Sequence, residues 1–327
     1  MCAFAYRAAL HIDPRTGIDE ECFVNINGVE ERVQIRGDDR NKPVLLWLNG
    51  GPGFSTIPYT LLFRDWERHF TVVMWDQRGE GRTFDRYGAK LRAAARPLMD
   101  KALAGDTRAI GQLSKEIHND KTVAPGMTIA QMTKDGVAVA EYLRVRLHKN
   151  KVILLGHSWG SLLGVHMVQA RPDLFSVYVG TGQIVNLERD SEAAYPLVLA
   201  RARAVHNAKA VEELTAAGPP PYRVEEFKKW TWIKWANALD PGPERTPLSP
   251  AIAWFFLRQL LSPQGLPPGA AFSQYVMWPE ILRDDLGSSA LDFAIPVVII
   301  DGTEDRVALP SLARAWFARI RAPSNSL

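Results

Sequence analysis

The chain has 327 residues, of which 46% are hydrophobic, enough for one large α/β domain or two smaller ones. With 39 basic and 36 acidic residues its net charge is only +3, which argues against a protein that binds nucleic acid through its overall charge. Two cysteines, Cys2 and Cys22, cannot build a disulfide framework or a zinc-type site. No stretch approaches 18 uninterrupted apolar residues, and the first residues make no convincing signal peptide. We therefore expect a cytoplasmic protein with no membrane span.

The N-terminal region predicts an antiparallel β-hairpin. Residues 22–38 hold two β-rich runs that flank Asn27-Gly28, and Asn-Gly is the strongest short-range signal of a hairpin turn. Short, uniformly apolar runs then recur along the chain, at residues 43–51, 70–79, 151–158 and 295–302. Such runs are typical of parallel strands that are covered on both faces.

Helix-like segments separate these runs, at residues 88–118, 129–148, 161–171 and 310–321. Alternating strands and helices predict an α/β fold with a mostly parallel, doubly wound sheet. In such a sheet the functional residues lie at the carboxyl ends of the strands. We therefore expect the site where the apolar runs stop.

Residues 184–290 break the alternation. They contain Pro-rich turns and no strong strand run, and they hold five tryptophans, at positions 230, 232, 235, 254 and 278. A helical insert between two strands of a sheet is typical of a cap over the active face. The expected organisation is a core formed by residues 1–183 and 291–327 with a helical cap at 184–290.

The first motif that carries chemistry lies around Ser158. A serine hydroxyl is a poor nucleophile until a base removes its proton and donors stabilise the resulting oxyanion. Gly156-x-Ser158-x-Gly160, between an apolar strand and a helix, fits a nucleophile elbow, a sharp turn that exposes the serine at the strand end. The N–H of Trp159, at the start of the following helix, is a candidate oxyanion donor.

A glycine-rich loop follows an earlier strand. Residues 48–53 read Leu-Asn-Gly-Gly-Pro-Gly, so the main chain of this loop can come close to a substrate. We expect the N–H of Gly51 to be the second oxyanion donor, with Asn49 and Gly50 as parts of the surrounding scaffold. An ordinary Gly-Pro turn would explain the composition but not the position of the loop.

The third motif is Trp-Asp-Gln-Arg-Gly-Glu-Gly-Arg-Thr at residues 75–83, at the end of the next strand. We expect Asp76 and Arg78 to form a buried or half-buried ion pair that holds the loops around the site. This is a scaffold role and not direct catalysis.

Together the three motifs resemble those of the proline iminopeptidase (prolyl aminopeptidase) family of α/β-hydrolases. The resemblance rests on Asn49-Gly-Gly-Pro-Gly53, Asp76-Gln-Arg-Gly-Glu-Gly81 and Gly156-His-Ser-Trp-Gly-Ser161, and it extends from about residue 20 to the end. It implies an α/β-hydrolase fold with a helical cap, Ser158 as the nucleophile and Asp305 as the acidic member of the catalytic triad. It implies no metal and no organic cofactor.

Asp305 also fits this role by position. It lies one short turn after the apolar run 295–302, where a carboxylate could orient an imidazole and stabilise its cation. A helix cap or turn aspartate is the competing interpretation, and Asp301 is a nearby alternative.

The histidine of the triad is not where the resemblance requires it. In this fold the order along the chain is Ser, then Asp or Glu, then His, and no histidine follows Asp305. The chain contains seven histidines, at positions 11, 69, 118, 148, 157, 166 and 206. We expect the side chain of His157 to point away from Ser158. We also expect the last strand and the histidine loop to be missing, which would leave the strand in 295–302 with an unpaired edge.

Two further departures concern specificity. The family usually starts the glycine loop with histidine, and this chain has Asn49. In the cap, Trp232 and Trp235 are candidate substrate-binding residues, but Ala236 stands where the family has a glutamate. Glu225 and Glu226 are other cap carboxylates that could hold a free amine.

The function predicted from the sequence is a serine hydrolase that releases N-terminal residues from small peptides or amides through an acyl-enzyme. An esterase on the same scaffold is the alternative, because one fold serves many substrates. A catalytically silent binding protein is another, because the proton acceptor is missing. The expected partner is a small peptide, amide or ester, with no nucleic acid and no membrane.

Overall fold

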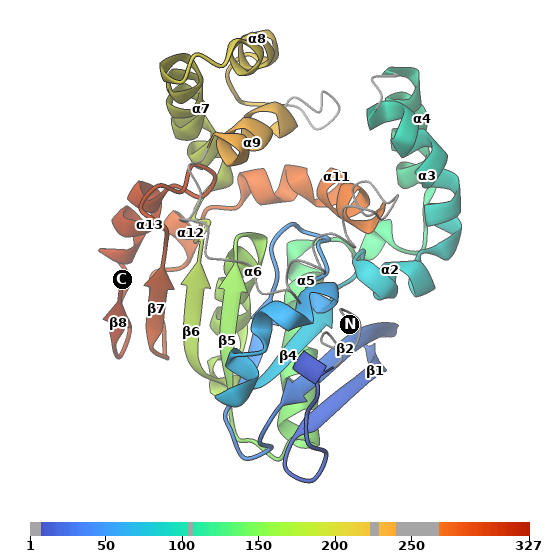
Figure 1. The fold of residues 1–327 in the computed structure, drawn as a ribbon, viewed down its shortest axis with the longest axis vertical. Helices are drawn as coiled ribbons and strands as arrows, with labels where there is room; N and C mark the ends of the chain where they lie inside the picture. Colours follow the sequence, from blue (N-terminus) through green and yellow to red (C-terminus); the bar gives the residue numbers. More distant parts are fainter. Residues whose placement is uncertain (1–7, 104–106, 223–228, 240–267) are drawn as a thin grey trace.

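The computed structural model describes residues 8–103, 107–222, 229–239 and 268–327. This part of the chain forms one eight-stranded sheet (Figure 1). In spatial order the strands are β1 (Ile18–Ile26), β2 (Val29–Gly37), β4 (Thr71–Asp76), β3 (Val44–Leu48), β5 (Val152–His157), β6 (Phe175–Thr181), β7 (Val297–Ile300) and β8 (Asn325–Ser326).

The predicted hairpin is confirmed. β1 and β2 pair in antiparallel orientation around Asn27 and Gly28, whose φ angles are 48° and 87°. Positive φ at both central residues is what the two-residue turns of hairpins need, and Asn and Gly adopt it at low cost. β2 also pairs antiparallel with β4, and from β4 onward each neighbouring pair of strands is parallel.

The helices fill the connections between the strands. In chain order they are α2 (Gly81–Tyr87), α3 (Ala89–Leu103), α4 (Thr107–Asn119), α5 (Ile129–Arg146), α6 (Trp159–Ala170), α7 (Leu187–Ala204), α8 (Ala208–Ala217), α9 (Lys229–Ala238), α11 (Pro268–Arg283), α12 (Leu286–Ser289) and α13 (Pro310–Phe317). Short 3₁₀ helices add η1 (Ile57–Phe63), η2 (Trp66–Arg68), η3 (Ala124–Gly126) and η4 (Pro172–Leu174). None of these helices is long and apolar enough to cross a bilayer.

Two apolar layers hold the central strands. Leu46 and Leu154 belong to the large core cluster that also contains buried side chains of α5 and α6. Their neighbours Leu45 and Leu155 belong to a separate cluster with Phe63 of η1. Successive side chains of a strand point to opposite faces, so the uninterrupted apolar runs in the sequence reflect strands packed on both sides.

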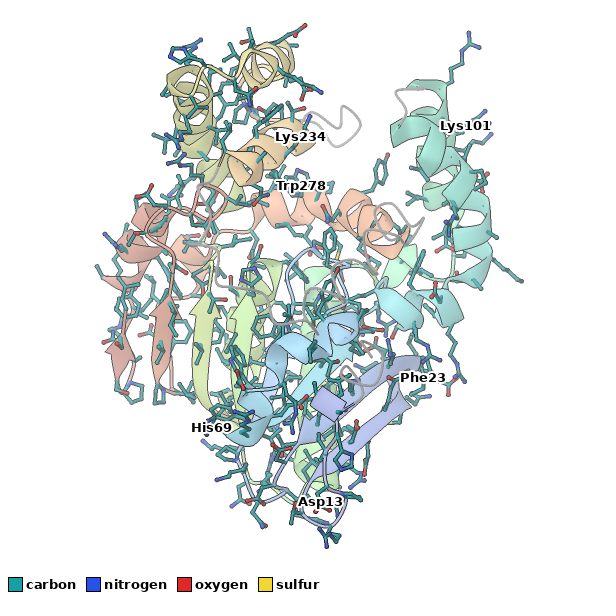
Figure 2. All side chains as sticks on the ribbon, in the orientation of Figure 1. Asp13, Phe23, His69, Lys101, Lys234 and Trp278 are labelled. Carbon is teal, nitrogen blue, oxygen red and sulfur yellow. The ribbon has the colours of Figure 1, made fainter. Side chains whose placement is uncertain are left out.

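The helices between β6 and β7 lie beyond the carboxyl ends of the central strands (Figure 1). Figure 2 marks α9 by Lys234 and α11 by Trp278. Buried residues of α7, α8 and α9 form a second cluster, which also includes Leu309 of the loop between β7 and α13. This arrangement fits a helical cap, and its expected borders at residues 184 and 290 stay a prediction.

The expectation that the last strand is missing is wrong in one respect. Asn325 and Ser326 form the short strand β8, which pairs in parallel with Val297 and Val298 of β7. The first half of β7 therefore has a partner on this side. Ile300, at the carboxyl end of β7, lies beyond this pairing and is 61% exposed.

Candidate active site

Ser158 occupies a sharp turn between β5 and α6. Its φ and ψ angles are 52° and −120°, a conformation that residues other than glycine rarely adopt. A Cβ atom at Gly156 would lie 2.2 Å from the carbonyl oxygen of Gly160, and one at Gly160 would lie 2.2 Å from the carbonyl oxygen of Leu48. The turn therefore requires both glycines of the predicted motif. It leaves the Ser158 side chain partly exposed at the strand end.

The start of α6 lies directly at this serine. Ser158 is the N-cap of the helix and Trp159 is its first residue. The first N–H groups of a helix have no partner within it, and the helix dipole adds a partial positive charge there. An oxyanion formed next to Ser158 would meet this positive end.

The glycine loop after β3 passes alongside the same serine. A Cβ atom at Gly50 would lie 3.2 Å from the Cβ of Ser158. Gly51 has a φ of 132°, which only glycine adopts without strain. The structure thus brings the expected donor loops of Gly51 and Trp159 to Ser158, and the donor roles themselves stay predictions.

Asp305 lies in the loop between β7 and α13. Its Oδ1 accepts hydrogen bonds from the N–H groups of Val307 at 2.8 Å and Ala308 at 3.1 Å. A Cβ atom at Gly182 would lie 3.6 Å from Asp305 Oδ2 and 3.4 Å from His157 Cε1. The second oxygen of the carboxylate is therefore on the side of Gly182 that His157 also occupies.

Asp301, the alternative acid, is also close to this place. Its Oδ1 accepts a hydrogen bond from the N–H of Gln183 at 3.0 Å, and its Oδ2 is buried without a hydrogen-bond partner among the described residues. Burial raises the pKa of Asp301, and the negative charge of Asp305 adds to the increase. The two carboxylates are thus close enough to interact.

His157 is the described imidazole nearest in sequence to Ser158. Its Nδ1 lies 3.0 Å from Thr181 Oγ1, and its ring stacks on Trp47 at a centroid distance of 6.2 Å. Removal of part of the ring from water lowers the pKa of His157, and the charges of Asp305 and Asp301 oppose this effect. These contacts are with residues other than Ser158, and the expected orientation of the ring away from Ser158 stays a prediction.

The expected ion pair between Asp76 and Arg78 is wrong, because the two side chains point to different neighbours. Asp76 is fully buried, and its Oδ2 accepts hydrogen bonds from Arg32 Nη1 of β2 at 3.3 Å and from the N–H of Arg82 at 2.9 Å. Burial raises the pKa of Asp76. Asp76 thus ties the end of β4 to β2 and to the start of α2.

Arg78 binds on the opposite side of this loop. Its Nε donates to Asp135 of α5, and Glu31 Oε1 of β2 lies 3.8 Å from the same nitrogen. All three side chains are buried. The predicted scaffold role therefore fits both residues, although they act through separate ion pairs.

Two loops, the glycine loop after β3 and the loop between β4 and α2, also fit closely under α11. A Cβ atom at Gly53 would lie 2.6 Å from the Cα of Ala270, and one at Gly79 would lie 2.3 Å from Ser273 Oγ. Ser273 Oγ donates a hydrogen bond to the carbonyl oxygen of Gly79 at 2.8 Å. This cap helix is therefore in direct contact with two of the loops that surround Ser158.

Comparisons with known proteins agree with this geometry. The α/β-hydrolase-fold family matches residues 43–204. A solved structure of a proline iminopeptidase-related protein from Thermus thermophilus superposes with a TM-score of 0.58 at 19% identity, over 95% of this chain and 89% of that chain. The chain has the α/β-hydrolase fold.

Curated relatives of this chain carry peptidase names. A probable aminopeptidase from Bacillus subtilis is 27% identical over 313 residues, which cover 92% of this chain and 86% of that protein. A probable proline iminopeptidase from Streptomyces coelicolor is 27% identical over 222 residues, 63% of this chain and 57% of that protein. The resemblance expected from the three motifs is thereby confirmed.

The two tryptophans singled out in the cap make packing contacts. Trp232 is fully buried, and Trp235 is buried with its Nε1 donating to Glu213 Oε2 at 2.9 Å. Both belong to the cluster of α7, α8 and α9. Their expected contact with substrate stays a prediction, and Glu225 and Glu226 lie outside the described residues.

Asp190 of α7 is a buried acid that the sequence did not single out. It is 0% exposed, and its Oδ1 accepts a hydrogen bond from the N–H of Leu309 at 2.8 Å, in the loop that carries Asp305. Burial raises the pKa of Asp190 to about 8, and the charges of Asp305 and Asp301 contribute to the increase. Asp190 thus joins the cap to the loop of the predicted catalytic acid.

This burial predicts a pH-dependent stability. From its usual pKa of 3.8 up to about 8, Asp190 keeps its proton in the folded state and loses it in the unfolded state. The contribution of this proton to the free energy of unfolding is therefore fully present below pH 3.8. It is lost as the pH rises to about 8, at about 1.4 kcal/mol per pH unit. Urea denaturation at pH 5, 6.5 and 8 should show Asp190→Asn gaining stability relative to the wild type as the pH rises. Asp65→Asn, at a side chain 84% exposed, is the control and should follow the wild type.

Proposed function

We propose that this α/β-hydrolase is a serine hydrolase with Ser158 as its nucleophile. The observation that carries the proposal is the turn at Ser158, which holds a non-glycine residue at positive φ at the end of a strand and the start of a helix. Such a conformation costs free energy, about 1–3 kcal/mol, and it recurs at catalytic nucleophiles.

In the proposed reaction Ser158 Oγ attacks the carbonyl carbon of the substrate and gives up its proton. The N–H groups of Gly51 and Trp159 stabilise the oxyanion of the tetrahedral intermediate. The leaving group departs with a proton, and water then hydrolyses the acyl-enzyme to release the acid and restore the serine. A base takes the proton from Ser158 and returns it to the leaving group, and Asp305 orients and stabilises this base.

As substrates we propose small peptides or amides from which the N-terminal residue is released. The names of the two curated relatives support this class. A helical cap beyond the strand ends supports a small substrate rather than a long chain.

A fluorophosphonate probe followed by peptide mapping tests the nucleophile. Fluoride leaves without taking a proton from the protein, so the only proton transfer that the probe requires is the deprotonation of Ser158. We expect the adduct on Ser158 and none in Ser158→Ala. The exposed Ser176→Ala variant is the control and should label like the wild type. An adduct on another residue would contradict the assignment.

The substrate class requires a separate comparison. Hydrolysis of proline arylamide should exceed that of a short acyl ester, relative to the spontaneous rate of each. Faster ester hydrolysis would favour an esterase. If the folded protein hydrolyses neither substrate and the fluorophosphonate probe does not label it, a binding protein would be favoured.

A further inference from the structure

Four buried side chains form a continuous chain of hydrogen bonds between the two loops next to Ser158. Trp159 Nε1 donates to Gln77 Oε1 at 3.1 Å, and Gln77 Nε2 donates to Asn49 Oδ1 at 3.5 Å. Asn49 Nδ2 donates to Glu80 Oε2 at 2.9 Å. Trp159 belongs to the elbow and Asn49 to the glycine loop, so the β4–α2 loop with Gln77 and Glu80 bridges them.

The direction of this chain is fixed. An indole N–H can only donate, so the oxygen of the Gln77 amide must face Trp159. The amide nitrogen of Gln77 must then face Asn49, whose own nitrogen is left to donate to Glu80. The last member has to accept a hydrogen bond, which a carboxyl oxygen does in either protonation state.

Water cannot replace these partners. Gln77 and Glu80 are 0% exposed, and Asn49 and Trp159 are each 1% exposed. The main chains that the network joins are also in contact, because a Cβ atom at Gly160 would lie 2.8 Å from the carbonyl oxygen of Asn49. A broken link would therefore leave a buried polar group unpaired and would move one loop against the other.

We propose that Asn49, Gln77 and Glu80 are positioning residues that set the distance between the N–H of Trp159 and the N–H of Gly51. This inference rests on the proposed function, in which these two groups stabilise the oxyanion. Donors of this kind act only when they lie within hydrogen-bond distance of the place where charge develops. The network joins Trp159, beside one donor, to Asn49, in the loop of the other donor, through the buried loop between β4 and α2.

The identity of Glu80 makes the role testable. Burial raises the pKa of Glu80 well above its usual value, and the negative charge of Asp76 adds to this effect. The group therefore does not need its charge to accept from Asn49. Gln has the same shape and an acceptor oxygen, whereas Leu has neither donor nor acceptor. Glu80→Gln should preserve the network and Glu80→Leu should break it.

The experiment measures turnover of p-nitrophenyl acetate and labelling of Ser158 by a fluorophosphonate. We expect Glu80→Leu to lower kcat about 10- to 100-fold with KM within about twofold, because the acylation transition state loses stabilisation and substrate binding does not. Glu80→Gln should stay within about threefold of the wild type. The labelling rate should follow kcat.

Gln77→Met is the second variant, in case Glu80→Leu does not fold. Methionine has a similar size but no amide to accept from Trp159 or to donate to Asn49, so kcat should again fall about 10- to 100-fold. Gln169→Met, at an exposed amide on α6, is the matched control and should be unaffected. Thermal unfolding identifies the folded variants.

The outcomes separate the two proposals. If the wild type shows no more turnover or labelling than Ser158→Ala, the proposed function fails and this inference fails with it. If the wild type reacts at Ser158, and a folded Glu80→Leu or Gln77→Met variant has the same kcat and labelling rate as the wild type, only the positioning role is overturned. A Glu80→Gln variant as slow as Glu80→Leu would also overturn it.

Discussion

Gly160→Ala is expected to lower the free energy of unfolding by about 3 kcal/mol or more, at the upper end for overpacking of a buried site. The added Cβ atom would lie 2.2 Å from the carbonyl oxygen of Leu48. Real Cβ contacts begin at about 3 Å, and the three nearest atoms, from Leu48 and Asn49, all belong to the main chain. Leu48 is held in β3 between β4 and β5, so it cannot move away without breaking strand pairs.

Urea denaturation of Gly160→Ala beside Gly111→Ala measures this effect. Gly111 lies in α4, and no heavy atom lies within 4 Å of the place of its Cβ. There the same change should stabilise the protein by about 0.5–1 kcal/mol, because alanine favours the helix. If the Gly160→Ala variant were as stable as the wild type, β3 and α6 would not lie as close together as they do in the structure.

Arg78→Met is expected to lower the free energy of unfolding by about 3–5 kcal/mol. Methionine keeps the apolar part of the side chain but leaves Asp135 and Glu31 without the cation between them. Both carboxyl groups are fully buried, and burial together with the nearby charge of Asp135 already holds the pKa of Glu31 well above its usual value. Removal of the shared arginine leaves two buried acids that keep hydrogen bonds from neutral side chains but have no cation beside them.

The matched control is Arg171→Met. Arg171 also contacts two acids, Asp173 and Glu141, but its side chain is 40% exposed and water replaces the lost partner. The loss there should be at most about 1 kcal/mol. Equal losses in the two variants, measured by urea denaturation, would contradict a special role for the buried cluster.

Local patterns in this sequence predicted local structure well. The hairpin turn depends on Asn27 and Gly28, and the elbow depends on Gly156 and Gly160 around Ser158, so a few neighbouring residues decide each of them. The apolar runs likewise indicated buried parallel strands. In each case the physical cause lies within a few positions of the pattern.

Contacts across long sequence separations were not predictable in this way. Asp76 pairs with Arg32, 44 positions away, and Arg78 pairs with Asp135, 57 positions away. The expected pair between neighbours was wrong because spacing along a chain says nothing about which strands and helices surround a loop. Gln77 was overlooked for the same reason, since its two partners lie far away in sequence, Asn49 in the loop after β3 and Trp159 at the start of α6.

The contact of α11 with the loops of Gly53 and Gly79 limits which helices of the cap can be exchanged between relatives. Gly53 and Gly79 leave no room for a methyl group beneath α11, so a change in that helix disturbs the surroundings of Ser158. α7 is held to the core in a similar way, by Asp190. α8, in contrast, packs on α7 and α9, whereas α9 also packs against the main core through Ile233. A chimera that takes only α8 from a relative would therefore change an outer part of the cap and leave the surroundings of Ser158 unchanged.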